Sequence, residues 1–123
     1  MEAALRDSAK KFAGVVRRER VIRRFFEARE AFEGNSELYA LRVEYTRLVH
    51  ELRGKQSEGT LAEDDVAELR ELEQKVNGHD VTKELSEAQV QAGEMLQRCN
   101  TVISERLGFD YASSAAAQRS CGC

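Results

Sequence analysis

Apolar residues recur at every third or fourth position along most of this chain, and this spacing constrains the fold more than any other feature. Side chains three and four residues apart share one face of an α-helix, whereas a strand brings every second side chain to the same face. No segment alternates over four or more residues between turn residues, and the sequence contains 0 proline residues to interrupt a helix. The pattern therefore predicts an all-α fold.

Glycines separate the apolar repeats, as is typical of residues just beyond helix ends. The two longest predicted helices span residues 37–56 and 80–107. The second of these has the longest apolar stripe, which comprises Leu85, Ala88, Ala92, Met95, Leu96, Cys99, Val102, Ile103 and Leu107. Residues that accept hydrogen bonds from free helical N–H groups favour helix starts, so we expect Ser36, Thr60 with Glu63, and Asp80 to cap three helices.

The first 33 residues are also apolar at helical spacing, but the phase slips between Arg17 and Arg20, which predicts a break. The whole chain is thus expected to form a bundle of about four to five helices, with the helices at 37–56 and 80–107 antiparallel to each other. We expect one domain over residues 1–111 and a flexible tail over residues 112–123.

A small core makes this chain a candidate for self-association. Its 123 residues include only 5 Phe and 0 Trp, and small chains gain little stability from their own interior. We expect a homodimer, or a heterodimer with a paralogue, formed mainly by the two long helices. The aliphatic residues expected in the core or the interface are Leu41, Leu48, Leu96 and Ile103.

The chain ends in Cys121-Gly122-Cys123, the most unusual feature of the sequence. Two thiolates so close together can supply half of a metal or iron-sulfur site, and the remaining ligands would come from Cys99 or another chain. A disulfide between Cys121 and Cys123 would be strained and therefore redox-active. The pair can also be incidental. Cys99 lies on an apolar stripe, where we expect it to pack as a small hydrophobic residue.

Sequence motifs of enzymes are missing: we find no G-x-S-x-G, no G-x-G-x-x-G, no P-loop and no H-E-x-x-H. His50 and His79 have no second ligand three or four residues away and are expected at the surface or at helix ends. We therefore predict a protein that is not an enzyme and has no small-molecule substrate.

An arginine-rich stretch contains the residues Arg17, Arg18, Arg20, Arg23 and Arg24. Such a cluster can contact the phosphates of RNA. Against this, Glu19 and Glu27 interrupt it, as on an ordinary solvated helix face, and no interleaved aromatic residues offer a stacking surface. The stretch is a candidate contact for RNA or for a partner protein, and direct RNA binding is disfavoured.

The sequence contains no apolar run near the roughly 20 residues that a membrane span requires, and its start has no apolar signal region. We therefore expect a cytoplasmic protein with no direct insertion into a membrane.

Three segments in this order resemble the YlbF/YmcA (Com_YlbF) family of bacterial regulators. These are FFEAREAFEGNSELYALRVEYTRL, ELRELEQKV and LQRCNTVISERLGFDYA, within a resemblance that runs from about Phe12 to Tyr111. The terminal CGC resembles the Cys-x-Cys tail of the YlbF-like branch. Specificity lies in the order of the segments and in the tail, because each helical segment alone is ordinary.

The resemblance implies an all-helical, oligomer-forming protein without catalysis of its own, which acts with partner proteins in competence, sporulation or biofilm development. It implies an association with RNase Y, a membrane-bound endoribonuclease whose mRNA processing the family steers. It also implies a 4Fe-4S iron-sulfur cluster shared through Cys121 and Cys123. The alternatives from the residues themselves are a thiol-redox or metal-handling protein acting through the tail, and a direct RNA-binding protein.

Overall fold

The computed structural model describes residues 1–121, with the side chains of residues 1–116. This part of the chain contains six helices and no strand, so the all-α prediction is confirmed, with one helix more than expected. The helices are α1 Glu2–Arg18, α2 Arg20–Glu33, α3 Ser36–Glu58, α4 Glu63–Asn77, α5 Asp80–Leu107 and α6 Tyr111–Cys121. The additional helix is α6, in the segment where we expected a turn and a tail.

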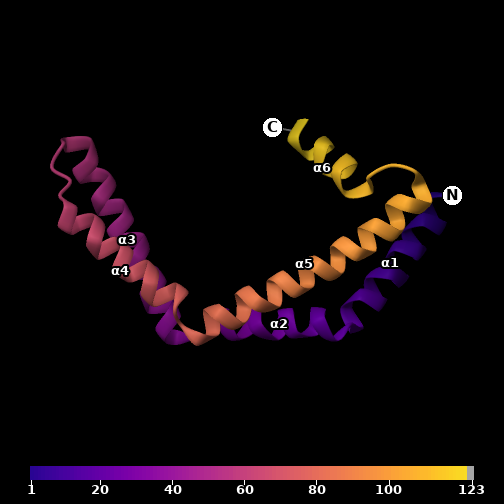
Figure 1. Cartoon of the computed structure of the whole chain (residues 1–123), viewed down its shortest axis with the longest axis horizontal. Coiled ribbons are helices and arrows are strands. Elements are labelled where there is room, and N and C mark those ends of the chain that lie inside the picture. The colour runs from indigo at the N-terminus through magenta and orange to yellow at the C-terminus, as the bar shows by residue number, and fades with distance from the viewer. Residues whose placement is uncertain (122–123) are drawn as a thin grey trace.

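The helices form two arms that meet in a V (Figure 1). One arm is the hairpin of α3 and α4. In the other arm the long helix α5 runs back along α2 and α1, and α6 folds over the inner side of the V from the far end of α5 (Figure 1). None of the helices in the described residues is long and apolar enough to cross a bilayer.

The predicted break near Arg17–Arg20 is confirmed at Glu19. Its backbone leaves the helical region, with φ −64° and ψ 136°, and so separates α1 from α2. The two long helices are also found where the apolar stripes place them, at Ser36–Glu58 and Asp80–Leu107. The periodicity therefore predicted the positions of these helices to within two residues.

The predicted cap of α3 is wrong by one position. Asn35, not Ser36, is the N-cap, and its Oδ1 accepts a hydrogen bond of 3.0 Å from the Leu38 N–H. The cap of α5 is shifted in the same direction, because His79 Nδ1 accepts from the Val81 N–H at 3.2 Å. Asp80 is then the first residue of α5, where its charge favours the positive end of the helix dipole.

The predicted capping box of Thr60 and Glu63 is also wrong. Helix α4 begins after Ala62, which has no side-chain acceptor, and Asp65 Oδ2 accepts a 3.0 Å hydrogen bond from the Ala62 N–H. The Thr60 hydroxyl instead donates to the Lys55 carbonyl at the end of α3, at 3.4 Å. Asp65 also forms a 3.0 Å ion pair with Lys55 and so joins the two helices of the hairpin.

The expected antiparallel pairing of α3 with α5 is corrected by the structure. Helix α3 packs on α4, and α5 packs on α2. The apolar stripe of α3 is used within the hairpin, where Leu48, Leu52 and Leu72 form a buried cluster. The stripe of α5 contributes the buried Ala88 and Ala92 on the arm where α5 packs against α2.

The buried core is small for the length of the chain. Eight hydrophobic residues of the described part are buried, and three of them are alanine: Ile22, Ala28, Leu38, Leu48, Leu52, Leu72, Ala88 and Ala92. The accessible surface is 9851 Å², whereas a compact monomer of 13.9 kDa exposes about 6,700 Å². The single chain thus leaves roughly 3,000 Å² more surface exposed than a compact fold of its mass.

Candidate protein-interaction surfaces

An apolar groove of about 300 Å³ runs between α1 and α5. Its apolar lining consists of Phe12, Val15 and Val16 from α1 and Met95, Cys99 and Val102 from α5. These residues are hereafter the α1–α5 face. Several of them remain open to solvent although they are apolar: Phe12 is 46%, Val15 52% and Val102 60% exposed. Large exposed apolar patches of this kind mark contact surfaces.

Charged residues of opposite sign flank this groove. Glu19, at the break between α1 and α2, and Arg98, on α5, both line it. In the described part of the chain they form no ion pair with each other. The groove is therefore lined by apolar residues together with one anionic and one cationic side chain.

A second groove of about 410 Å³ lies where α1, α2 and α5 meet, and its lining is almost wholly apolar. Leu96, Phe25 and Phe26 line it together with Gly93. The guanidinium of Arg17 lies 5.9 Å from the centre of the Phe26 ring. Val16 lines both grooves, so the two apolar grooves adjoin at α1.

Helix α1 has 17 residues and none of them is buried, although its apolar and polar residues lie on separate faces. Leu5, near its start, is 67% exposed. Most of the stability of a helix in a protein comes from covering its apolar face. Within one chain, α1 lacks most of this cover.

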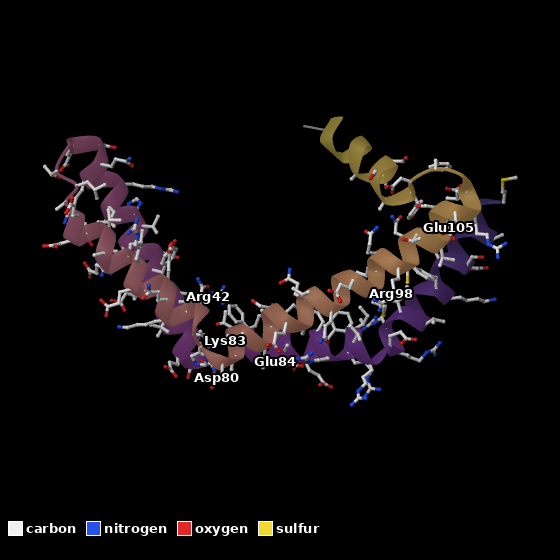
Figure 2. All side chains as sticks on the ribbon, viewed as in Figure 1. Arg42, Asp80, Lys83, Glu84, Arg98 and Glu105 are labelled. Atoms are coloured by element: carbon white, nitrogen blue, oxygen red, sulfur yellow. The ribbon has the colours of Figure 1, made fainter. Side chains whose placement is uncertain are left out.

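A separate surface lies on α3, near the vertex of the V (Figure 2). Tyr39, Arg42, Val43 and Thr46 line a shallow depression of about 290 Å³ there. Tyr39 is 63% and Val43 51% exposed, and Arg42, labelled in Figure 2, lies with its guanidinium 5.0 Å from the Phe32 ring centre. These four residues are hereafter the α3 face. Tyrosine and arginine are the residue types that most often dominate binding energy at protein interfaces.

The four predicted interface residues are divided between the two arms. Leu48 is buried in the hairpin core, and Leu41 is half-buried against that core. Leu96 is 47% exposed and Ile103 is half-buried, both on α5. The structure thus does not bring these four side chains together within one chain.

The predicted interface residues did not include the exposed apolar residues of α1 and α3. Phe12 and Val15 belonged to the apolar pattern of the first 33 residues, but we assigned the interface to the longer stripes. The sequence did contain an indication of these residues, because the segment that forms α1 has an apolar stripe and no other segment was assigned to cover it. Tyr39 and Val43 gave no signal, because they lie beside the main stripe of α3.

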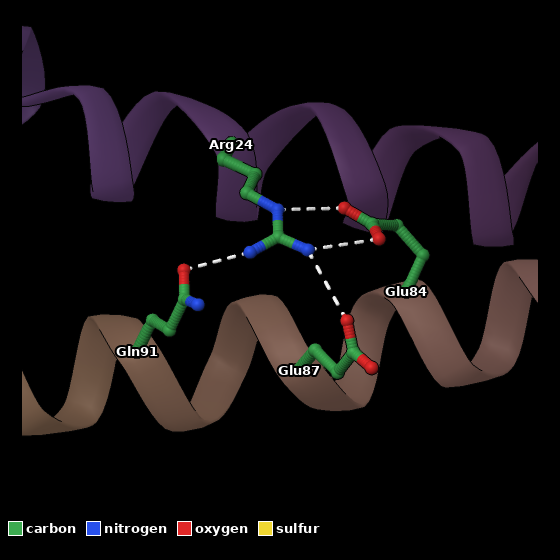
Figure 3. Close-up of polar contacts among 4 residues, drawn as sticks. All are labelled: Arg24, Glu84, Glu87 and Gln91. Atoms are coloured by element: carbon green, nitrogen blue, oxygen red, sulfur yellow. Dashed lines mark hydrogen bonds and ion pairs between the residues drawn. The ribbon is translucent and has the colours of Figure 1, made fainter.

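The arginine-rich stretch does not form one continuous surface. Arg24 crosses from α2 to α5, where its Nε and Nη2 donate to both carboxylate oxygens of Glu84 at 2.7 and 2.9 Å (Figure 3). The same guanidinium donates to Gln91 at 2.7 Å and to Glu87 at 3.4 Å. The hydrogen bond from Arg24 holds the pKa of Glu84 below its ordinary value of 4.5. Arg24 is therefore used to join two helices.

The remaining arginines of the stretch lie on both sides of the break at Glu19. Arg17 and Arg18 end α1, whereas Arg20 and Arg23 belong to α2. Arg20 and Arg23 share a surface depression with Arg24 and the acidic Glu27. Arg24 is paired with acidic residues and Arg17 lies over an aromatic ring. Fewer arginines are therefore free to contact a phosphate than the sequence indicated.

Helix α6 is attached to α5 by a network of polar side chains. The backbone N–H groups of Tyr111 and Ala112 donate to Ser104 Oγ at 3.0 Å and Asn100 Oδ1 at 3.1 Å. Asp110 accepts from the Ser113 N–H at 3.2 Å, and this bond is the main reason that the pKa of Asp110 lies below 3.8. The free N–H groups at the start of α6 are thereby satisfied.

The thiols of Cys121 and Cys123 lie outside the described residues and side chains. Cys99 is a half-buried free thiol in the α1–α5 face, in keeping with the apolar position predicted for it. His50 is exposed, and His79 caps α5. Among the described side chains, no group of three or more His, Cys, Asp or Glu residues could hold a metal ion.

Residues 5–108 match the sequence profile of the family described as Control of competence regulator ComK, YlbF/YmcA. The match covers α1 to α5 and ends at the glycine that follows α5. No curated protein and no solved structure shows significant similarity to the chain.

Proposed function

We propose, because the chain belongs to the YlbF/YmcA family of competence regulators, that it is a non-catalytic regulatory adaptor that binds partner proteins. The family match over residues 5–108 is the observation that carries this proposal. The partner we propose is a ribonuclease of the RNase Y type, whose mRNA processing the adaptor would direct during development.

The α3 face is the surface that best suits such a partner. It combines an exposed tyrosine and an exposed valine with an arginine of α3, and none of these residues belongs to the buried hairpin cluster. A partner that covers Tyr39 and Val43 would remove apolar surface from water, and Arg42 could pair with its carboxylates. Leu48 and Leu52 of the same helix remain buried in the hairpin core.

We further propose that Cys121 and Cys123 supply two thiolate ligands to an iron-sulfur cluster shared with another chain. Thiolates are the usual protein ligands of such clusters. The bound cluster would supply a link between chains that depends on oxidation state.

Affinity purification from the native host under anaerobic conditions tests the adaptor proposal. The wild-type chain should recover the ribonuclease, whereas Tyr39→Ala with Val43→Ala should recover at least about tenfold less, since interface hot spots each contribute about 2 kcal/mol or more. Glu44→Ala is the matched control, because Glu44 is an exposed residue of the same helix outside the α3 face. Failure of the wild-type chain to recover any ribonuclease would contradict the proposed partner.

The cluster proposal has its own test. Cys121→Ser with Cys123→Ser should abolish the visible absorption of iron-sulfur that copurifies with the complex, while the ribonuclease is still recovered through the α3 face. Unchanged absorption in this double variant would show that the tail holds no cluster.

A further inference from the structure

We infer that a groove between α3 and α4 receives an amphipathic helix of the partner ribonuclease, with a carboxylate of that helix on Arg42 and a basic side chain on Glu73. This role rests on the proposed adaptor function and extends the contact surface from the α3 face to α4. It also assigns a chemistry to the segment that the partner contributes.

The groove adjoins the α3 face and has a volume of about 430 Å³. The residues that line it are Arg42, Tyr45 and Thr46 from α3 and Glu73, Val76 and Asn77 from α4. These six residues are hereafter the hairpin groove. Arg42 and Thr46 also line the depression of the α3 face, so the two surfaces are continuous. A partner seated on the α3 face therefore lies next to α4.

The hairpin groove suits a segment of a protein better than a small molecule. Four of its six residues are exposed and two, Tyr45 and Val76, are half-buried. Sites for small ligands usually enclose most of the ligand surface, which a groove with exposed walls does not do. A helix laid between the two helices of a hairpin contacts both of them and leaves its outer side in water. This is a common mode of recognition for an amphipathic helix.

The two walls of the hairpin groove carry one charge each, and the two charges are opposite. Arg42 belongs to α3, and its guanidinium lies 5.0 Å from the centre of the Phe32 ring. Glu73 belongs to α4, and its Oε1 accepts a hydrogen bond of 2.9 Å from the Tyr45 hydroxyl. Within the described part of the chain, neither Arg42 nor Glu73 forms an ion pair. A complementary helix therefore brings a carboxylate to the α3 wall and a cation to the α4 wall.

The hairpin core holds the groove in shape. Tyr45 packs against the buried cluster of α3 and α4, and its hydrogen bond to Glu73 joins the two walls. An apolar side chain of the partner that covers Tyr45 and Val76 removes their exposed apolar surface from water. The cation on one wall and the anion on the other then fix the register of the bound helix.

Exchange of the two charges tests this order. Arg42→Glu with Glu73→Arg keeps the net charge of the chain but presents the wrong sign to the partner on each wall. The ribonuclease that the wild-type chain recovers should bind this double variant about tenfold more weakly, because two attractive pairs become two repulsive pairs. Biolayer interferometry with the full-length chain measures the Kd, and thermal unfolding checks that the variant folds. Recognition of net charge alone predicts the wild-type Kd instead.

Glu73→Gln separates the charge from the hydrogen bond. The glutamine Oε1 can still accept from Tyr45, so the two walls stay joined while the negative charge is removed. The Kd should rise about two- to fivefold, as for the loss of one exposed ion pair, and the difference from the wild type should shrink at high salt. Glu71→Gln is the matched control, since Glu71 is an exposed residue of α4 outside the hairpin groove, and it should leave the Kd unchanged.

A photoreactive residue in place of Asn77 identifies the occupant. It should cross-link to a helical segment of the ribonuclease that carries both acidic and basic residues. A cross-link only to a second copy of this chain would overturn the inference.

The remaining outcomes separate the groove contact from the adaptor function. If the charge exchange and Glu73→Gln both leave the Kd unchanged while Tyr39→Ala with Val43→Ala weakens binding, the groove contact is wrong and the adaptor function stands. If the wild-type chain binds no ribonuclease, both are wrong.

Discussion

Replacement of Leu72 by Ala should destabilise the hairpin of α3 and α4 without unfolding the other arm. Leu72 is 6% exposed and packs with Leu48 and Leu52, and the partly buried Leu41, Tyr45 and Leu69 pack against this cluster. The substitution removes three carbons from apolar surroundings, which at about 0.8 kcal/mol per buried CH₂ is a loss of about 2.4 kcal/mol.

The cavity left by this substitution adds little to the loss. Leu-to-Ala changes in closed cores cost about 2–5 kcal/mol, and the larger values belong to sites that cannot collapse. The cluster here lies between two helices with solvent on both sides, so its neighbours can move in. We therefore expect a loss of about 2–3 kcal/mol, near the lower end of that range.

Hydrogen exchange locates this loss, and urea unfolding followed by circular dichroism measures its size. The hairpin contacts the rest of the chain mainly where α4 meets α5, so amides of α3 and α4 should lose protection while those of α2 and α5 keep it. The matched control is Leu61→Ala, which removes the same atoms from a turn residue that is 39% exposed. Equal losses in the two variants, or a loss spread evenly over all helices, would refute the reasoning.

Three further predictions concern backbone, packing and charge. Gly108→Ala should cost about 1 kcal/mol in thermal unfolding, because Gly108 has φ +83° and an L-residue is strained there even though no atom lies in the way. Ala88→Leu should lower the free energy of unfolding by about 1–3 kcal/mol, because Ala88 is 0% exposed and a larger side chain overpacks the contact of α2 with α5. The control Ala40→Leu, at an exposed position, should leave the thermal unfolding nearly unchanged. The lowered pKa of Glu84 contributes stability that is present above pH 4.5, its ordinary pKa, and is lost as the pH falls through the lowered value. Acid titration followed by circular dichroism should therefore show that Arg24→Gln loses less stability at low pH than the wild type does. Identical acid profiles of the two proteins would contradict the ion pair.

The sequence predicted the helices well because periodicity is a local property. The stripe from Leu85 to Leu107 and the slip before Arg20 are both visible over a few turns, and both are found in the structure. Cap positions were wrong by one or two residues because several neighbouring residue types can cap: Asn35 and Ser36 are both good caps, and only the backbone path decides between them.

The pairing of the helices could not be read from the same stripes. A stripe shows which side of a helix is apolar but not which helix will cover it. Leu48 and Leu96 have the same pattern around them, yet the first is buried against α4 and the second lines an open groove. The interaction surfaces followed from this pairing, so Phe12 and Tyr39 became evident only once the partners of α3 and α5 were known.

The V-shaped layout also separates the effects of mutation. The hairpin core draws on Leu48, Leu52 and Leu72, whereas the other arm is held by Ala88, Ala92 and the Arg24 ion pair. Free-energy changes at sites that share no neighbours add independently. Substitutions on the hairpin can therefore accumulate without altering the packing of α5 on α2, and the reverse also holds. A regulator built in this way can change the surface of one arm while the core of the other arm stays intact.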